Sequence, residues 1–287
     1  MIVGTRDSRL ALAQTNIFTK MIAPHSKTEI NIMTIKTTGD ADQTSSLKDM
    51  GGFGAFVREL DNALIRNEID VSVNSMKDIP VQRSPEITIG AVLPRASCED
   101  VILPVRINEL PKGAVVGSSS VRRSVALRNL RPDLDIRALR GNIDTRLRKL
   151  DSGGYDAIIL AKAGLERLGI VREMYVLSID DFVPAPAQGA IAAACRSSDR
   201  EMIWTLGKID DAKARTETQA ERDIMTVMGG NCSSPVGINV KRERTALRVR
   251  AMFFDGTVLR KCNKEIPINY AASDLEKIAA ELRGVKR

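Results

Sequence analysis

The chain has 287 residues, too many for one compact core, and its 43% hydrophobic and 28% charged residues are typical of a globular protein. Aromatic residues make up only 3%, which argues against binding of single-stranded nucleic acids by base stacking. The net charge is +7, and arginine outnumbers lysine 28 to 15. Because the arginine fork grips carboxylate and phosphate in a bidentate manner, we expect an anionic ligand.

Targeting segments and metal sites are not expected. The first residues carry charges where a signal peptide would be apolar, and no apolar run is long enough to cross a membrane. We therefore expect a cytoplasmic protein without membrane contact. The cysteines Cys98, Cys195, Cys232 and Cys262 are far apart and are expected to be reduced thiols. With His25 as the only histidine, we predict no metal.

The first 210 residues alternate short apolar strands with helical patterns, which predicts parallel α/β units with right-handed crossovers. Strands at 88–94 and 189–195 are expected to let the chain leave the first lobe and return to it. The other expected strands are 2–5, 29–36, 70–75, 114–120, 134–139 and 155–161, and the helices between them are 10–21, 56–67, 121–130 and 143–150.

The pattern changes after about residue 213. A helix at 214–228 leads into a glycine-containing loop, three strands at 236–240, 246–254 and 258–266, and a last helix at 273–283. The fold class predicted is α/β, with two doubly wound lobes and a small C-terminal α+β domain. The predicted domains are 1–94 with 188–212, 95–187, and 213–287.

Positive charge is concentrated between residues 115 and 150, where eight arginines and one lysine stand against three aspartates. Basic and hydroxyl side chains follow four predicted strands, at the edge where open α/β sheets bind ligands and helix N-termini attract anions. Each has a plainer explanation: Ser8, Ser119 or Ser120 could cap a helix, and Arg146 could be an exposed helix residue. Together the four turns favour an anion site between two lobes. They contain Arg6 and Ser8; Ser75, Lys77 and Asp78; Ser118, Ser119, Ser120, Arg122 and Arg123; and Arg140, Gly141 and Arg146.

Two residues in such loops have open roles. Asp78 either forms a structural ion pair with Lys77 or acts as a general acid and base. Cys232 lies in the loop GGNCSSP, where glycines permit close approach to a ligand. A lone cysteine is usually an inert apolar residue, although a polar loop favours a reactive thiol.

Six segments in chain order carry a family resemblance. They are TRDSRLALAQ at 5–14, NSMKDIP at 74–80, GSSSVRR at 117–123, RALRGNIDTRL followed by YDAIILAKAGLERLG at 137–169, AQGAIAAACR at 187–196, and GGNCSSPVG at 229–237. In this combination the chain resembles the porphobilinogen deaminases, also called hydroxymethylbilane synthases.

The resemblance implies a fold and a reaction. The family has two lobes like those of periplasmic solute-binding proteins and a small third domain, which here is 213–287 and carries the cofactor cysteine. Its members are transferases of porphyrin and heme biosynthesis that join four porphobilinogen molecules into a linear tetrapyrrole and release ammonia. The chain grows on a dipyrromethane cofactor, held by a thioether that falls on Cys232 here. The partner expected is porphobilinogen alone, with no nucleic acid, and a monomer is expected.

The motifs also imply roles for single residues. Asp78 would assist loss of ammonia and stabilise the cation that forms, with Lys77 and Arg6 completing the catalytic group. The resemblance places these residues against the cofactor: Cys232, Lys77, Asp78, Ser119, Ser120, Arg122, Arg123, Arg140 and Gly141. It places these against the substrate: Arg6, Ser8, Arg146, Arg167, Gln188 and Gly189.

The chain departs from the family pattern at several positions. Asp49 and Phe53 stand where lysines are common, so a lysine-bearing lid loop at 47–56 cannot be assumed. Thr38, Asn74 and Ala187 replace the usual arginine, histidine and glycine. None of these changes removes Asp78 or Cys232, so we expect activity to be retained.

Two other functions remain open at this point. A solute-binding protein of similar fold would bind an anion without catalysis, but that class is normally exported and gives Cys232 no task. A nucleic-acid binder would show a steep salt dependence of affinity, yet the sequence has no recognition-helix motif.

Overall fold

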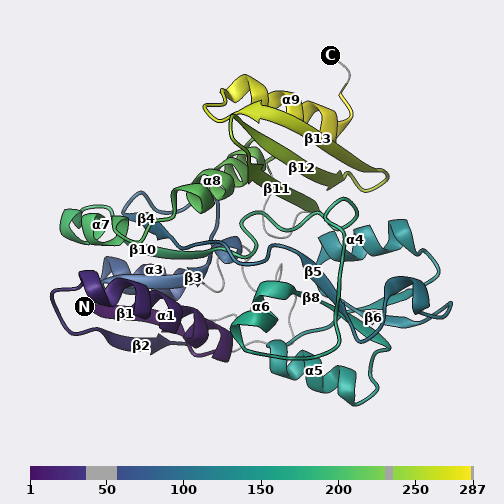
Figure 1. The fold of residues 1–287 in the computed structure, drawn as a ribbon, viewed down its shortest axis with the longest axis horizontal. Coiled ribbons are helices and arrows are strands. Elements are labelled where there is room, and N and C mark those ends of the chain that lie inside the picture. Colours follow the sequence, from purple (N-terminus) through teal and green to yellow (C-terminus); the bar gives the residue numbers. More distant parts are fainter. Residues whose placement is uncertain (37–56, 230–234, 286–287) are drawn as a thin grey trace. The chain divides into compact units, whose positions relative to one another are not determined.

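The computed structural model describes residues 1–36, 57–229 and 235–285 (Figure 1). The chain divides into two compact units, one formed by Met1–Ala96 with Gly189–Arg215 and the other by Ser97–Gln188 with Thr216–Arg287. The finer division into three domains stays a prediction. Residues 38, 49, 53 and 232, which the sequence singled out, lie outside the described ranges.

The first unit contains a mixed five-stranded sheet. Its strands are β1 (Ile2–Arg6), β2 (Asn31–Ile35), β3 (Val71–Ser75), β4 (Ile87–Val92) and β10 (Ile191–Arg196). Their order is β2-β1-β3-β10-β4, with β1 parallel to β2 and β3. β10 is antiparallel to both β3 and β4, which confirms that these segments carry the chain out of and back into the sheet.

The expectation of purely parallel units was therefore wrong in one respect. A period-two apolar pattern identifies a strand but not its direction, so the antiparallel return strand could not be recognised.

Helices cover both faces of this sheet. They are α1 (Arg9–Ile22), α3 (Arg58–Ile65) and α7 (Arg200–Gly207), with short 3-10 turns η1 (Ala23–His25) and η2 (Met76–Asp78). Phe18 of α1 and Leu206 of α7 pack with Ala193, whereas Leu60 of α3 packs with Ala194. Because neighbouring strand residues point to opposite faces, α3 lies on the face away from α1 and α7.

The second unit holds a second mixed sheet, in the order β7-β6-β8-β5-β9. β6 is parallel to β7 and β8, and β5 is antiparallel to β8 and β9. β5 and β9 were not predicted. The strands are β5 (Asp100–Leu103), β6 (Val115–Gly117), β7 (Asp135–Arg137), β8 (Ala157–Ala161) and β9 (Tyr175–Val176).

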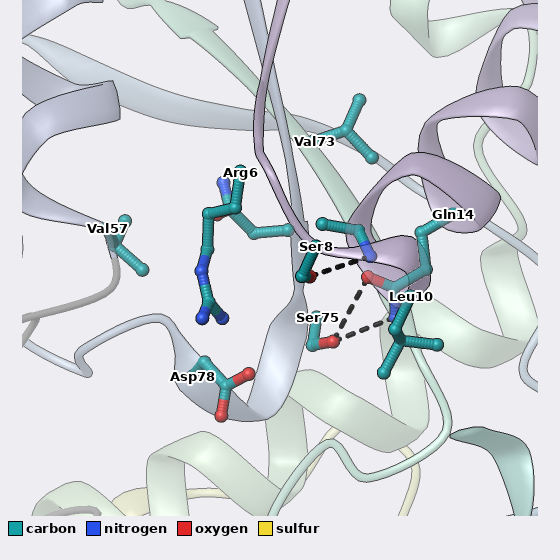
Figure 2. Close-up of a pocket in the computed structure, with 10 residues that line it drawn as sticks. Arg6, Ser8, Leu10, Gln14, Val57, Val73, Ser75 and Asp78 are labelled. Carbon is teal, nitrogen blue, oxygen red and sulfur yellow. Dashed lines mark hydrogen bonds between the residues drawn. The ribbon is translucent and has the colours of Figure 1, made fainter. Parts of the chain in front are cut away.

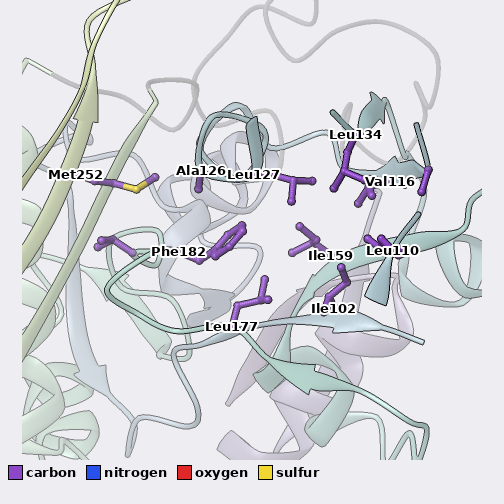
Figure 3. Packing of buried hydrophobic residues seen from close by; sticks show 13 residues of the cluster. Ile102, Leu110, Val116, Ala126, Leu127, Leu134, Ile159, Leu177, Phe182 and Met252 are labelled. Atoms are coloured by element: carbon purple, nitrogen blue, oxygen red, sulfur yellow. The ribbon is translucent and has the colours of Figure 1, made fainter. Parts of the chain in front are cut away.

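The helices of this sheet are α4 (Val121–Leu130), α5 (Ile143–Asp151), α6 (Lys162–Arg167) and the turn η3 (Ile107–Glu109). Leu127 of α4 joins a core with Ile159 and Phe182 (Figure 3). Leu147 of α5 packs instead with Ile158, on the opposite face. Both sheets are thus covered on two sides, as the α/β prediction required.

A small antiparallel sheet follows α8 (Ala212–Val227). It consists of β11 (Val236–Arg242), β12 (Ala246–Phe254) and β13 (Leu259–Pro267). The helix α9 (Ala272–Arg283) packs on β12 and β13 (Figure 1). Met252 of β12 reaches the core around Phe182 (Figure 3). The predicted fold class, two α/β lobes and a small α+β part, is confirmed.

Candidate active site

A pocket opens at the carboxyl ends of β1 and β3 in the first unit (Figure 2). These strands are parallel neighbours, so the turn after Arg6 and the turn after Ser75 meet at one edge of the sheet. The volume is about 50 Å³, which suits one carboxylate-sized group. Residues lining it are Arg6, Ser8, Leu10, Ala11, Gln14, Val57, Val73, Asn74, Ser75 and Asp78.

Ser8 is the N-cap of α1. Its Oγ accepts a hydrogen bond of 3.2 Å from the Ala11 N–H, which satisfies one of the unpaired donors at the start of the helix. The plain structural explanation for Ser8 is confirmed, and its contact with substrate stays a prediction. A capping hydroxyl retains a second lone pair and its own proton, so both functions are chemically compatible.

Ser75 ties the η2 turn to α1. Gln14 is buried, and its Nε2 donates to Ser75 Oγ at 2.8 Å, while that hydroxyl donates to Gln14 Oε1 at 3.2 Å (Figure 2). The Met76 N–H donates to the Ala190 carbonyl at 3.0 Å. These contacts fix the backbone that carries Lys77 and Asp78. Gln14 was not recognised from the sequence, where it appeared only as a polar residue within a helical pattern.

Asp78 is half-buried and lines the pocket. Arg6 extends its guanidinium group toward the side of the pocket where Asp78 lies (Figure 2). Within residues 1–36, 57–229 and 235–285, the Asp78 carboxylate has no hydrogen-bond or ion-pair partner, so the structural pairing with Lys77 is not formed. Lys77 itself is half-buried. A carboxylate left available beside cationic side chains suits proton transfer.

In the second unit, the turns after β6 and β7 also meet. Ser119 Oγ donates to the Leu139 carbonyl at 2.8 Å and joins them. Ser120 is the N-cap of α4, where its Oγ accepts from the Arg123 N–H at 3.4 Å. Ser118 Oγ accepts from the Ser120 N–H at 3.3 Å. Of the two serines considered as caps here, Ser120 takes that position.

Arg122 and Arg123 are buried on either side of Asp100, a residue that the sequence did not point out. Their exposed fractions are 4% and 7%, and that of Asp100 is 0%. The Arg122 Nη2 atom lies 2.8 Å from Asp100 Oδ2, and the Arg123 Nη2 atom lies 2.7 Å from Oδ1. Arg122 also donates to the Val183 carbonyl at 2.7 Å, and Arg123 to the Ile159 carbonyl at 3.2 Å.

This arginine–aspartate cluster carries two positive charges and one negative charge. Burial alone would raise the pKa of the Asp100 carboxyl, but the guanidinium groups of Arg122 and Arg123 outweigh burial and hold that pKa well below its usual range. Arg123 Nε is buried without a hydrogen-bond partner in the described part of the chain. The cluster is therefore a buried group with one excess positive charge, which favours an anion nearby.

Gln188 completes the cluster rather than standing apart from it. With an exposed fraction of 1%, it donates from Nε2 to Asp100 Oδ1 at 2.8 Å and to the Cys98 carbonyl at 2.7 Å. Its direct contact with substrate stays a prediction. The preceding Ala187 has φ +60° and donates its N–H to the buried Glu221. Gly189, with φ +88°, begins the return into the first unit.

The remaining predicted arginines lie around the turn after β7 and at the end of α6. Arg140 is half-buried, and Gly141 has φ +105°, a conformation that favours glycine. Arg146 Nε donates to the Gly141 carbonyl at 2.8 Å, so it is bound to the turn rather than extended along the helix surface. Burial lowers the pKa of the Arg167 guanidinium to about 10, with Glu166 opposing that effect.

Two of the four thiols are unsuited to reaction. Burial raises the pKa of Cys195 to about 11 and that of Cys262 to about 12, which leaves almost no thiolate at neutral pH. Cys98 is half-buried and accepts from Asn239 Nδ2 at 3.5 Å. Cys232 lies outside the described residues.

Two further findings concern the described residues only. No group of three or more histidine, cysteine, aspartate or glutamate side chains there is placed to hold a metal ion. None of the helices in the same ranges combines the length and apolar character that crossing a membrane requires.

Comparison with known proteins gives a consistent family. A family model described as "Porphobilinogen deaminase, dipyromethane cofactor binding domain" matches residues 1–204. A "Probable porphobilinogen deaminase" of Methanococcoides burtonii is 40% identical over 94% of this chain and 89% of that protein. The "Porphobilinogen deaminase" of Lysinibacillus sphaericus is 44% identical over 82% and 78%, and that of Sorangium cellulosum is 38% identical over 98% and 96%.

Solved structures show a much weaker likeness. The periplasmic VFT2 domain of Bordetella pertussis BvgS, as the double mutant F375E/Q461E, is 13% identical with a TM-score of 0.43, covering 72% of this chain and 84% of that one. The fold assignment above therefore depends on the strand order and packing of the chain itself.

Proposed function

The chain belongs to the porphobilinogen deaminase family, and from that membership we propose how its residues carry out the reaction. The protein is a hydroxymethylbilane synthase, a transferase that condenses four porphobilinogen molecules head to tail and releases ammonia. Its product is the linear tetrapyrrole used in porphyrin and heme biosynthesis, and its cofactor is dipyrromethane.

The residues of the second unit fit that cofactor. Each pyrrole ring bears an acetate and a propionate, so the cofactor brings several carboxylates to one place. The arginine–aspartate cluster has one excess positive charge and an unpartnered Nε on Arg123 within the described residues, both of which suit a carboxylate. We assign Arg122, Arg123, Arg140 and Gly141 to the cofactor, together with the Ser119 and Ser120 turn.

Cys232 is proposed as the point of attachment, through a thioether. Support comes from the family motif GGNCSSPVG and from the high pKa values that burial gives Cys195 and Cys262. When bound, the cofactor supplies the pyrrole end onto which each new unit is added. A covalent anchor makes that addition a reaction between two bound partners, which lowers its entropic cost.

The pocket of the first unit is proposed to bind and activate the substrate. Arg6 and Ser8 would hold its carboxylates, and Asp78 would exchange a proton at the pyrrole nitrogen and stabilise positive charge on the ring as ammonia leaves. Lys77 would support the acidic side chains. Arg146, Arg167, Gln188 and Gly189 complete the proposed substrate contacts. The single observation that carries this assignment is the Asp78 carboxylate, which has no partner among the described residues and borders a pocket that Arg6 also lines.

Partners and location are proposed in the same way. Porphobilinogen is the small-molecule substrate, and we infer no nucleic-acid or membrane partner, a monomer and a cytoplasmic location. The division into lobes 1–94 with 188–212, 95–187 and a domain 213–287 that carries Cys232 is part of this proposal.

The intact mass of the purified chain tests the proposal. We expect the wild-type mass to exceed that of the polypeptide by two pyrrole units and Cys232→Ser to lack the increment. Cys98→Ser is the matched control, because among the described residues Cys98 is the half-buried cysteine, and it should retain the increment. An unmodified wild-type mass, with no ammonia released from porphobilinogen, would sink the proposal and favour a non-catalytic anion-binding protein.

A further inference from the structure

A buried carboxylate stands between the two arginines assigned to the cofactor. Asp100 is the first residue of β5, an antiparallel strand between β8 and β9. Both of its oxygens lie at ion-pair distance from an arginine, Oδ2 at 2.8 Å from Arg122 and Oδ1 at 2.7 Å from Arg123, and among the described residues only Oδ1 also accepts a hydrogen bond. An aspartate at the start of an apolar strand is out of place unless charged groups meet it there, because a lone buried charge is strongly disfavoured.

The geometry fixes both guanidinium groups from several directions. Arg122 is held between Asp100 and the Val183 carbonyl, and Arg123 between Asp100 and the Ile159 carbonyl. Gln188 donates to Asp100 and holds the carboxylate in turn. These partners come from β5, β8 and the segment after β9. The positions of the two guanidinium groups therefore depend on the folded unit and not on α4 alone.

The charges decide what the arrangement can do. Two adjacent buried guanidinium groups repel one another, and one carboxylate compensates half of their charge. A second carboxylate from the protein would neutralise the pair and remove its attraction for a ligand. One aspartate therefore keeps the arginines together while leaving one positive charge for an anion.

We propose that Asp100, held by Gln188, is a positioning residue that sets Arg122 and Arg123 for one carboxylate of the cofactor. The proposal rests on the proposed contact between these arginines and dipyrromethane. Asp100 itself touches neither cofactor nor substrate, since it is fully buried behind the arginines.

The test compares cofactor loading in Asp100→Asn with that in Asp61→Asn. Asp61 accepts from Arg83 Nε at 2.9 Å in another largely buried ion pair, so its loss lowers stability without touching the cluster. Intact mass spectrometry of the folded full-length proteins, with folding checked by thermal unfolding, measures the fraction carrying the two-pyrrole increment. We expect Asp61→Asn to be loaded like the wild type and Asp100→Asn to be loaded about ten-fold less, by analogy with the loss seen when a residue that orients a metal-binding side chain is removed.

Asp100→Glu separates positioning from stability. It restores the negative charge but displaces the carboxylate by one methylene, so thermal stability should recover further than loading does. If Asp100→Asn does not fold, Gln188→Met replaces it, because it keeps all three charges and removes the donor to Asp100 together with the bond to the Cys98 carbonyl. Loading of Asp100→Asn, or of Gln188→Met in its place, equal to that of Asp61→Asn would overturn the positioning role alone. A wild-type protein without the increment would overturn the proposed function as well.

Discussion

The two groups of charged side chains assigned to the reaction differ in how their charges are compensated. In the first unit, the Asp78 carboxylate borders a pocket and has no partner among the described residues. In the second unit, Asp100 is fully buried and shared by two arginines and Gln188. A carboxylate without partners is available for proton exchange, whereas one with three partners holds its neighbours in place. We therefore assign an aspartate to the chemistry in the first unit and another to the positioning of arginines in the second.

Removal of the Asp78 carboxylate should have the largest effect on the rate of the reaction. We expect Asp78→Ala to fold, to keep the two-pyrrole increment and to lower kcat by about 10²–10⁴-fold, the range for loss of a general acid or base. Steady-state release of ammonia, with intact mass on the same sample, measures both. The matched control is Asp7→Ala, which removes an exposed carboxylate from the turn that carries Arg6. A wild-type rate in Asp78→Ala would contradict the catalytic role of Asp78 and with it the contrast with Asp100.

The Asp100 carboxylate should make the free energy of unfolding depend on pH. Its pKa is depressed in the folded state, so the ionised form stabilises the fold above the unfolded pKa, and that stabilisation is lost as pH falls below it. The unfolded value is about 3.9. We expect Asp100→Asn to be less stable than the wild type by about 3 kcal/mol at pH 7, as for other broken buried pairs.

Thermal unfolding of both proteins between pH 7 and pH 3 measures this difference. It should stay constant down to about pH 5 and shrink below about pH 4, because the Asp100 carboxyl of the unfolded wild type then binds a proton while the folded one stays ionised, which favours unfolding of the wild type alone. A constant difference down to pH 3 would mean that Asp100 stabilises the fold by shape rather than by charge. Asp61→Asn should show a smaller loss at pH 7, since the Arg83–Asp61 pair keeps some contact with water.

The sequence predicted the residues around Asp78 better than the cluster around Asp100. Strand-end turns with basic and hydroxyl residues have a local signature, and Arg6, Ser8 and Asp78, which follow two such strands, line one pocket of the first unit. The anion site between two lobes stays a prediction. Asp100 has no such signature, because its partners are 22, 23 and 88 residues away and meet it only through the antiparallel strand β5. The direction of that strand, like that of β10, is a tertiary property that alternating apolar residues do not encode.

The N-cap of α4 could likewise be predicted only in part from the sequence. The sequence allowed Ser119 or Ser120 as the N-cap of α4, and the structure selects Ser120 because Ser119 donates to Leu139 across the two turns. Local propensity identified the helix start, and a contact between two loops decided which serine capped it.

The smallest effect concerns Ala187, the residue before Gln188 in the second unit. Its φ of +60° strains a residue with a Cβ by about 1–2 kcal/mol, so Ala187→Gly should relieve that strain. Two effects of the substitution lower stability. Loss of the buried methyl group costs about 0.8 kcal/mol, and the greater freedom of glycine in the unfolded chain costs about 0.5–1 kcal/mol. The terms nearly cancel, so we expect a change within about 0.5 kcal/mol.

Ala126→Gly is the matched control, because Ala126 is equally buried but lies in the helix α4, where no strain is relieved. It should lower the free energy of unfolding by about 1.3–1.8 kcal/mol. Denaturant unfolding of both variants measures the contrast, and cofactor loading should be unchanged in Ala187→Gly because its N–H still donates to Glu221. Equal losses in the two variants would show that Ala187 carries no strain. The contact with Glu221 would then hold the loop before Gln188 without backbone strain at Ala187. The geometry of the second unit would not depend on a strained residue.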